Sequence, residues 1–289
     1  MTMRYQIVDV FAEKKYAGNP LAVVLDAGAL SDTAMQAIAR EMHLSETAFV
    51  RSDGGEDRAY DVRIFTPERE VPFAGHPTLG TAYVIREEVL QEPVPEVRLN
   101  LAAGEVPVSF APDGIAWMRQ NPPVFTGEFP PDTLAGVLSL PETAIDTRFP
   151  VEEVSTGLPF IIVPVRSLES VRRAAIDRDA YEELISTTAA KAVFIFCPEP
   201  YRPENTFNAR VFADHFGVPE DPATGSANGC LAGYLLRHGY LGDSLDIRVE
   251  QGCEIHRPSL IRCRAERHGE SITVQVGGRV IPVARGNLL

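Results

Sequence analysis

The sequence contains few cysteines, and their spacing matches no common metal or redox motif. The four are Cys197, Cys230, Cys253 and Cys263, and no two of them form a C-x-x-C pair. This argues against a zinc ribbon and against a redox-active dithiol. We therefore expect reduced, mostly buried thiols.

Long apolar runs are also missing. No run reaches the roughly 18 residues that a membrane-spanning helix needs. The first residues, MTMRYQIVDVF, lack the long apolar region of a signal peptide. A cytoplasmic location is the resulting expectation.

Positive charge is scarce. Lys and Arg together number 27 against 40 Asp and Glu, which gives a net charge of −13. Such a surplus of acid argues against nucleic acid and anionic membranes as partners. It leaves a small-molecule substrate open, because a pocket can be locally positive on an acidic protein.

Cofactor motifs are missing as well. The histidines show neither H-x-x-x-H nor H-E-x-x-H spacing, so no metal site is predicted. The segment PATGSANG (222–229) lacks the Lys-[Ser/Thr] of a phosphate-binding P-loop, and no G-x-G-x-x-G follows a strand pattern. We expect no nucleotide, metal or other cofactor.

The chain itself has a globular composition, with 289 residues of which 45% are hydrophobic. That length suits two domains. Ser31 is a candidate N-cap for a helix whose apolar face repeats at helical spacing, through Met35, Ile38, Ala39 and Met42. Strand patterns outnumber helices, and they occupy residues 21–25, 60–65, 105–110, 160–165, 192–197, 246–250 and 271–276. The proline-rich stretch 121–150 is predicted to connect the domains.

An internal repeat organises the chain. AGNPLAVVL (17–25) resembles STGLPFIIV (155–163), VRIF (62–65) resembles ARVF (209–212), and PTLGTA (77–82) resembles PATGSA (222–227). The three matches occur in the same order, each separated by about half the chain. We infer two similar halves that arose by duplication and are related by a pseudo-twofold axis.

The third match has a chemical consequence. Each half is predicted to place a Pro-x-x-Gly turn at the start of an apolar helix. The N–H groups of a helix's first turn have no partners within the helix and lie at the positive end of its dipole. Two such helix starts facing one inter-domain cleft would bind a carboxylate or an enolate-like oxyanion.

Side chains suited to proton transfer lie beside these turns. His76 and Asp221 belong to them, and Glu46 lies between a predicted helix and the apolar segment 48–50. An apolar setting raises the pKa of a carboxyl toward neutrality, where it can transfer protons. Structural roles stay open: Asp221 as a helix cap, Ser226 as a small first-turn residue, and Cys230 as a core thiol.

The motifs DVFAEKKYAGNPLAVV, EMHLSETAFV, RIFTPEREVPFAGHPTLGTA and EDPATGSANG together resemble those of the PhzF, or phenazine biosynthesis-like, isomerase family. The resemblance covers essentially the whole chain. It implies an α+β architecture of the diaminopimelate-epimerase-like fold, in which each of two pseudo-symmetric domains wraps a sheet around a central helix. The expected domains are residues 1–121, possibly completed by 282–289, and residues 122–281.

The resemblance also implies roles for particular residues. Glu46 of the SET motif corresponds to the proton-shuttling residue, and His76 and Asp221 correspond to further catalytic positions. The expected substrate-binding residues are Ser45, Gly75, Gly225 and Ser226. The family implies a cofactor-independent isomerase, a small carboxylate-bearing substrate and a homodimer. His43 departs from the expected Asn and could alter the polarity of the pocket.

Two other functions stay open at this point. One is an epimerase or racemase on the same fold, either cysteine-independent or of the kind that uses two opposed thiols, although neither turn contains a cysteine here. The other is a non-catalytic protein that binds a small anion. A binder needs hydrogen-bond donors and not a base, so the set of Glu46, His76 and Asp221 favours an enzyme.

Overall fold

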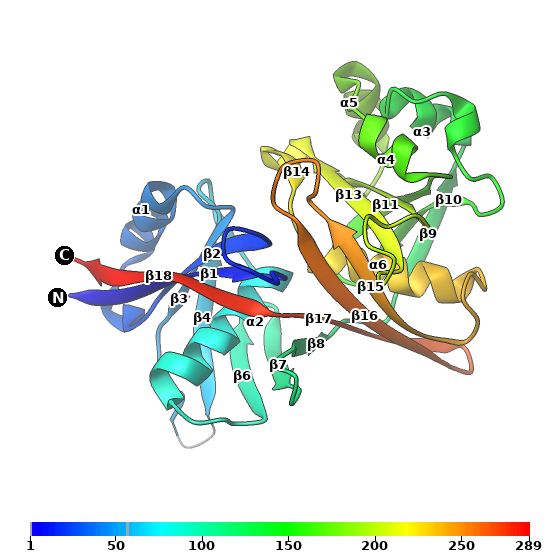
Figure 1. Cartoon of the computed structure of the whole chain (residues 1–289). Coiled ribbons are helices and arrows are strands. Elements are labelled where there is room, and N and C mark those ends of the chain that lie inside the picture. The colour runs from blue at the N-terminus through cyan, green and yellow to red at the C-terminus, as the bar shows by residue number, and fades with distance from the viewer. Residues whose placement is uncertain (1, 56–57) are drawn as a thin grey trace. The chain divides into compact units, whose positions relative to one another are not determined.

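The chain forms two compact units, shown in Figure 1, and each is described by itself. The structure, a computed structural model, describes residues 2–55 and 58–289. Unit 1 consists of Met1–Arg119 and Gly277–Leu289, and unit 2 of Gln120–Val276. Among the described residues, no helix is long and apolar enough to cross a membrane.

Unit 1 is dominated by strands. They are β1 (Met3–Val10), β2 (Asn19–Val24), β3 (Glu46–Val50), β4 (Ala59–Phe65), β5 (Glu70–Val71), β6 (Glu96–Leu101), β7 (Gly104–Phe110), β8 (Ala116–Arg119) and β18 (Val280–Leu288). The helical segments are η1 (Ala27–Ala29), α1 (Asp32–Met42), α2 (Gly75–Val84) and a π-helical continuation, η2 (Ile85–Leu90).

Unit 2 has a similar make-up. Its strands are β9 (Val124–Phe129), β10 (Val151–Ser155), β11 (Pro159–Pro164), β12 (Val193–Cys197), β13 (Phe207–Ala213), β14 (Val218–Asp221), β15 (Ser244–Gln251), β16 (Ser259–His268) and β17 (Ser271–Gly278), the last of which runs on into unit 1. Its helices are α3 (Pro131–Val137), η3 (Glu142–Ala144), α4 (Leu168–Arg173), α5 (Arg178–Thr187), η4 (Asp214–Phe216) and α6 (Gly225–Arg237).

The two units share one strand topology. In unit 1, β1 and β2 are antiparallel, β2 and β3 parallel, and β3 and β4 antiparallel; β4 then pairs antiparallel with β5 and parallel with β6. In unit 2, β10 to β15 pair in the same order and with the same orientations. The predicted duplication is therefore confirmed.

Each unit is built around one buried helix. In unit 1, α2 contacts β1, β2, β3, β6, β7, β8 and β18, and nine of its ten residues are buried. In unit 2, α6 contacts β10, β11, β15 and β16 and is buried from Ala227 to Leu236. The predicted wrapping of a sheet around a central helix is confirmed.

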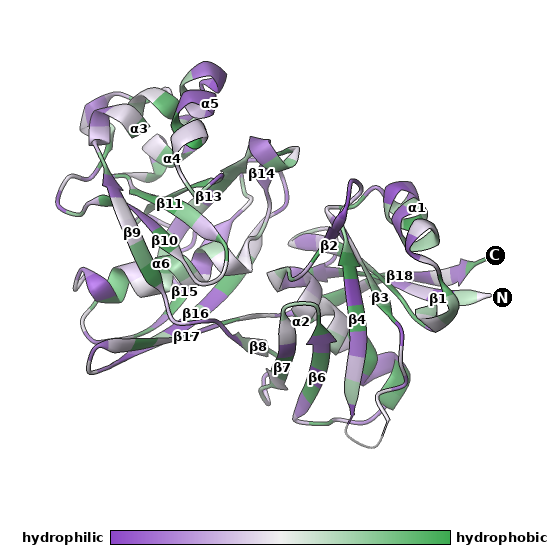
Figure 2. Cartoon of the chain, turned by 180° about the vertical axis from the view of Figure 1, so that it is seen from behind, coloured by the Kyte–Doolittle hydropathy of each residue, from purple (hydrophilic) through white to green (hydrophobic). Residues whose placement is uncertain are grey.

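The remaining helices pack elsewhere on the sheets. Ser31 caps α1 by accepting a hydrogen bond from the Ala34 N–H at 3.2 Å, as its position predicts. Met35 and Ala39 of α1 pack on Phe49 and Phe65 in a core cluster separate from α2. In Figure 2, hydrophilic and hydrophobic residues alternate along α1, which matches its amphipathic sequence.

The third match of the internal repeat, between residues 77–82 and 222–227, was predicted in the wrong register. PTLGTA (77–82) lies inside α2, which already starts at Gly75, whereas PATGSA spans the turn before α6. The turns that correspond are Pro72–His76 and Pro222–Ser226, with Gly75 and Gly225 as the first helical residues. The sequence match was misleading because Pro77 and Gly80 imitate the turn while helix packing, not turn geometry, requires them: a Cβ on Gly80 would come 2.6 Å from a Leu21 methyl group.

The proline-rich stretch 121–150 is not a connection between domains but a folded part of unit 2. It contains β9, which pairs with β10, and α3, whose Leu134 and Val137 are buried in a core cluster. Pro131 sits in the first turn of α3, where proline is tolerated because its missing N–H would have no helical partner.

Candidate active site

Glu46 opens β3 in unit 1. It lies beside Leu21 in the parallel β2–β3 pair, and its side chain is 19% exposed. Superposing the two topologies through Gly18 and Gly157 places Ala192 at the equivalent position in unit 2, just before β12. Only one half of the duplicated chain therefore carries a carboxylate at this point.

His76 is the second residue of α2 and is buried, with 6% of its surface exposed. Its Nε2 lies 3.4 Å from Oε2 of Glu46. Burial lowers the pKa of His76 to about 3, against the opposing effect of a hydrogen bond from the ring to the Pro20 carbonyl. The imidazole is therefore neutral near pH 7.

The neutral ring has a defined tautomer. Within the described residues Nε2 makes no hydrogen bond, so the bond to the Pro20 carbonyl comes from Nδ1–H. A neutral imidazole with its proton on Nδ1 has a lone pair on Nε2. That lone pair faces Glu46, so the two residues can share a proton whenever the Glu46 carboxyl carries one.

The buried ring predicts a pH-dependent stability. The pKa of His76 falls from 6.5 in the unfolded chain to about 3 in the folded protein, so below pH 6.5 the unfolded chain binds a proton that the folded protein does not. The contribution of His76 to stability is complete above pH 6.5 and is lost as the pH falls toward 3. Urea unfolding at pH 7, 6 and 5 measures the free energy of unfolding. As the pH falls, this free energy should decrease less for His76→Asn than for the wild type.

His268 provides the control for this titration, because its side chain is 52% exposed. His268→Asn should follow the wild-type pH dependence. Equal pH dependence in the wild type and His76→Asn would contradict a buried neutral His76.

In unit 2, Asp221 ends β14 beside the start of α6. Its Oδ2 accepts a short hydrogen bond from the Thr224 hydroxyl, and its backbone carbonyl accepts one from Gln251 Nε2 at 2.8 Å. Thr224, and not Asp221, occupies the N-cap position of α6. Asp221 is therefore not the N-cap of α6.

The turn before α6 is held by an amide that the sequence did not reveal. Gln251 Nε2 also donates to Thr224 Oγ1 at 3.0 Å, and its Oε1 accepts from the Thr224 N–H at 3.2 Å and from Asn228 Nδ2 at 2.9 Å. Gln251 is fully buried at the end of β15. No short motif joins it to the turn, because the β-sheet brings Gln251 and Thr224 together from 27 residues apart in the chain.

Both central helices start without a side-chain cap. The N-cap of α2 is Ala74, which has no capping group, and the Thr224 hydroxyl is turned toward Asp221 instead of the helix. The first-turn N–H groups at Gly75–His76 and Gly225–Ser226 are therefore left for another acceptor. Such helix starts favour an anion.

The other predicted residues lie beside these groups. Gly75 and Gly225 are buried first residues of their helices, and Ser226 is partly buried at the position that His76 holds in α2. Ser45 is partly buried in the bend before Glu46. His43 is exposed and ends α1 in the left-handed conformation with φ 52°, so its evident role is that of a helix C-cap.

Glu220, the other acid before α6, is neutralised within its own unit. It forms a two-pronged ion pair with Arg210, at 3.1 and 2.7 Å. Unit 1 repeats this pair with Arg63 and Glu70, at 2.7 and 2.6 Å. The duplicated pair shows that Glu220 serves the fold, which leaves Asp221 as the carboxylate at this turn.

The cysteines are placed as core residues. Cys197, Cys230 and Cys263 are buried and free, and Cys253 is partly buried. Burial raises the pKa of the Cys230 thiol to about 12, so it is not a thiolate near pH 7. Neither helix start carries a cysteine, which disfavours an epimerase with two opposed thiols.

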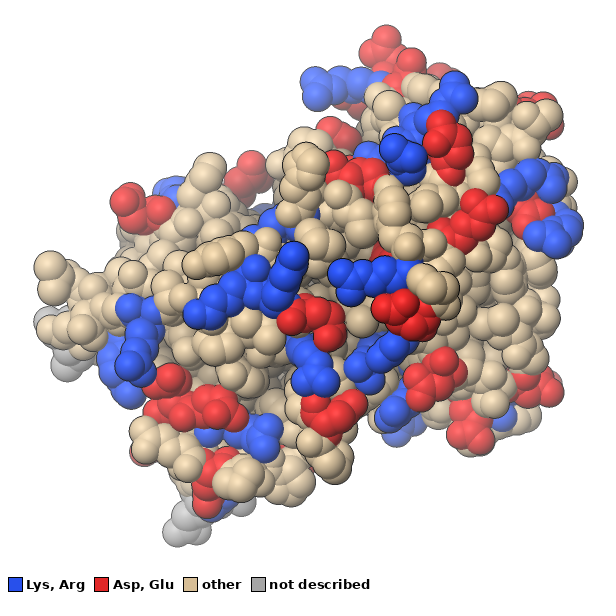
Figure 3. Space-filling model, in the orientation of Figure 1, with Lys and Arg blue, Asp and Glu red and all other residues tan. Residues whose placement is uncertain are grey.

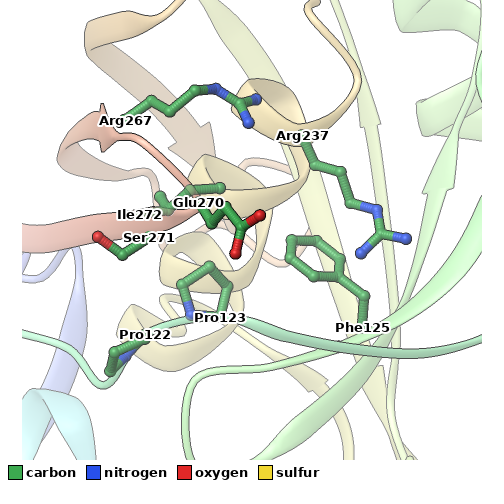
Figure 4. A pocket seen from close by; sticks show the side chains of 8 residues that line it. All are labelled: Pro122, Pro123, Phe125, Arg237, Arg267, Glu270, Ser271 and Ile272. Carbon is green, nitrogen blue, oxygen red and sulfur yellow. The ribbon is translucent and has the colours of Figure 1, made fainter.

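A pocket of about 250 Å³ on unit 2 is lined by none of the predicted site residues (Figure 4). Its Arg237 stacks on Phe125 at 4.2 Å and lies 3.6 Å from Glu152, and its Arg267 donates to the Leu236 carbonyl. These cations thus complement the C-terminal end of α6. On the face shown in Figure 3, basic and acidic side chains are interspersed. Among the described residues, no group of His, Cys, Asp and Glu is arranged to hold a metal ion.

A duplicated fold with a carboxylate and a neutral histidine at one helix start is an arrangement that could transfer a proton. The family model described as "Phenazine biosynthesis-like protein" matches residues 8–286. The chain belongs to this family, and the PhzF resemblance predicted from its motifs is confirmed.

Curated relatives and solved structures agree with this assignment. The trans-2,3-dihydro-3-hydroxyanthranilate isomerase of Pseudomonas chlororaphis is 36% identical over 99% of each chain. An uncharacterized isomerase of Mesorhizobium japonicum is 35% identical, also over 99% of each chain. The crystal structure of a PhzF-family protein from Bacillus anthracis has a TM-score of 0.91 at 29% identity, covering 100% of this chain and 99% of the other. The chain is accordingly a member of a family of isomerases.

The fold extends to more distant proteins. A hydroxyproline epimerase from Agrobacterium vitis matches 99% of this chain and 91% of its own with a TM-score of 0.64 at 12% identity, and this likeness concerns the fold alone. The predicted α+β class with two epimerase-like units is confirmed.

Proposed function

We propose that this protein isomerises a small carboxylate-bearing substrate by moving a proton from one carbon to another, without a cofactor. The proposal rests above all on Glu46 Oε2 lying 3.4 Å from a neutral His76 at an uncapped helix start. Such a pair can remove, hold and return a proton, while the helix start stabilises the negative charge that develops on the substrate.

Each residue has a role in this scheme. Glu46 takes the proton from carbon, and the electron pair of that C–H bond forms a new double bond. The π pair of the adjacent double bond shifts to a further carbon, where the same carboxyl redelivers the proton. His76 accepts a hydrogen bond from the protonated carboxyl and orients it. No net oxidation occurs, so the step needs no redox partner. The presence of a carboxylate in only one half favours this one-base shift over a two-base inversion.

Unit 2 supplies recognition. We propose that the N–H groups at Gly225 and Ser226, with the Ser226 hydroxyl, bind the substrate carboxylate, and that Asp221 binds a hydroxyl or ammonium group elsewhere on the substrate. Ser45 and Gly75 are proposed contacts in unit 1. A common binding cleft for both sets is a prediction, which a crystal structure with a bound carboxylate would test.

The compound named for the Pseudomonas relatives, trans-2,3-dihydro-3-hydroxyanthranilate, is the first substrate to test. It carries the carboxylate, hydroxyl and amine that the scheme requires. Incubation in D₂O followed by NMR should show an isomeric product and deuterium at carbon, because a carboxyl proton exchanges with solvent. If the compound is not turned over, the same assay on other hydroxy- and amino-carboxylates identifies the substrate.

A binding protein would behave differently in this assay. It would retain a carboxylate tightly while every carbon-bound hydrogen of the ligand stayed unexchanged over hours. That result would contradict the isomerase and favour the non-catalytic alternative.

A further inference from the structure

A second glycine turn in unit 2 lies against the start of α6 and has no role in the scheme so far. It consists of Thr156, Gly157 and Leu158, between β10 and β11. Thr156 is 4% exposed, and its Oγ1 lies 3.4 Å from the Ser226 carbonyl oxygen. The Leu158 carbonyl faces Cys230 Sγ at 3.7 Å, so the turn is attached to the first two turns of α6.

Gln120 completes this arrangement. Its Oε1 lies 3.3 Å from Thr156 Oγ1, it is 6% exposed, and its Nε2 has no hydrogen-bond partner among the described residues. Thr156 has a single hydroxyl hydrogen, which cannot serve both Gln120 Oε1 and the Ser226 carbonyl. With the carboxamide turned by 180°, which fills the same volume, Nε2 donates to Thr156 and the hydroxyl donates to Ser226. This chain of bonds gives the Thr156 hydroxyl both a donor, Gln120, and an acceptor, the Ser226 carbonyl.

The helix is shaped to admit these two side chains. A Cβ on Gly229 would come 3.1 Å from Gln120 Cγ and 3.4 Å from Thr156 Oγ1. Glycine inside a helix is less favourable than alanine, so its presence here reflects the close approach of Gln120 and Thr156.

Unit 1 contains a related contact. There Pro20, the second residue of β2, lies against the second residue of α2, because the Pro20 carbonyl accepts the bond from His76. In unit 2 the turn of Gly157 contacts Ser226, the second residue of α6. In both units a residue within two positions of the repeated glycine thus contacts the helix residue that the proposed function places in the site.

We propose that Thr156, oriented by Gln120, is a positioning residue that fixes the first turn of α6 for binding of the substrate carboxylate. The peptide unit that joins Ser226 to Ala227 is rigid, so a bond to the Ser226 carbonyl also fixes the direction of the Ala227 N–H, a first-turn donor. This role rests on the proposed function, since it concerns the same anion-binding helix start.

Replacement of Thr156 by valine removes the hydroxyl and keeps the shape. With trans-2,3-dihydro-3-hydroxyanthranilate, or the carboxylate that the exchange assay identifies, Thr156→Val should raise KM about tenfold, the order expected for one lost hydrogen bond. The kcat of Thr156→Val should stay within about threefold of the wild-type value, and the pH profile of kcat should not shift, because the proposed proton transfer is made by Glu46 and His76. Thr156→Ser keeps the hydroxyl and should restore the wild-type KM.

Binding without turnover is the second readout. In the Glu46→Gln background, calorimetric titration of the same carboxylate should give a dissociation constant about tenfold higher with Thr156→Val than without it. Gln120→Met, which keeps the volume of the side chain, should act in the same direction and serves as the test if Thr156→Val does not fold.

The outcomes separate the two proposals. A wild-type KM in Thr156→Val, or equal damage in Thr156→Ser and Thr156→Val, overturns the positioning role while Glu46→Gln remains inactive. Full proton exchange in Glu46→Gln instead overturns the proposed function, and the role of Thr156 in it falls too.

Discussion

Glu46→Gln should lower turnover by about 10³-fold or more and abolish deuterium incorporation from D₂O, with substrate binding retained. Glutamine fills the same space next to His76 but can neither accept nor deliver the proton. General acid–base catalysis by one residue contributes typically about 10²–10⁴-fold, and here one carboxyl is assigned both transfers. Single-turnover NMR in D₂O measures the rate of turnover and the incorporation of deuterium together.

The matched control is Glu41→Gln, an exposed residue of α1 that undergoes the same chemical change. It should keep wild-type rates. Unchanged exchange in Glu46→Gln would show that the base lies elsewhere, while an intermediate rate in Glu46→Asp would show that the carboxyl is required at the length that reaches the substrate.

The candidate site could be proposed from the sequence where its residues lie in short motifs. Glu46, His76 and Asp221 could be proposed as site residues because each lies in a motif of consecutive residues, next to a turn or strand with its own local pattern. The contact of Glu46 with His76 could not be derived from that pattern. It depends on the packing of α2 against the β2–β3 pair, which joins segments 30 residues apart.

The fold, too, could be predicted where it depends on local patterns and not where it depends on contacts between distant residues. Residues 60–65 alternate and form β4, and Ser31 caps α1 as predicted, because period and capping are local properties. The proline-rich stretch was misread, since the burial of Leu134 and the pairing of β9 with β10 depend on residues far along the chain. The register of the third repeat failed for a related reason: a glycine needed for helix packing looks like a glycine needed for a turn.

The acidic residues before α6 looked unfavourable for an anion-binding helix start. The structure divides their roles. The negative charge of Glu220 is neutralised by Arg210. Asp221 accepts a hydrogen bond from the Thr224 hydroxyl, which turns that hydroxyl away from the N–H groups of the helix. An acid at this turn can therefore keep the helix start uncapped for a ligand. The charge and the anion site are compatible, because the Thr224 hydroxyl is turned toward Asp221 and makes no capping bond to α6.

Arg210→Met should destabilise unit 2 by about 3–5 kcal/mol, because it leaves the buried Glu220 carboxylate without its partner. The Arg210 and Glu220 side chains are only 10% and 8% exposed. Arg210 also donates to the Val171 and Ala174 carbonyls at 2.9 and 2.7 Å, so its loss leaves these acceptors open as well. For a domain of this size, calorimetry should show a melting temperature lower by at least about 6 °C.

The repeated pair in unit 1 supplies the comparison. Arg63 makes the same two-pronged contact with Glu70, but the two side chains are 21% and 36% exposed. Water screens this pair and solvates the glutamate that remains, so Arg63→Met should cost only about 1 kcal/mol. Equal losses in the two variants would show that the shared geometry, and not the difference in burial, sets the energy of the pair. A larger loss for Arg210→Met is expected because the Glu220 side chain is only 8% exposed, so water solvates its carboxylate less than that of Glu70.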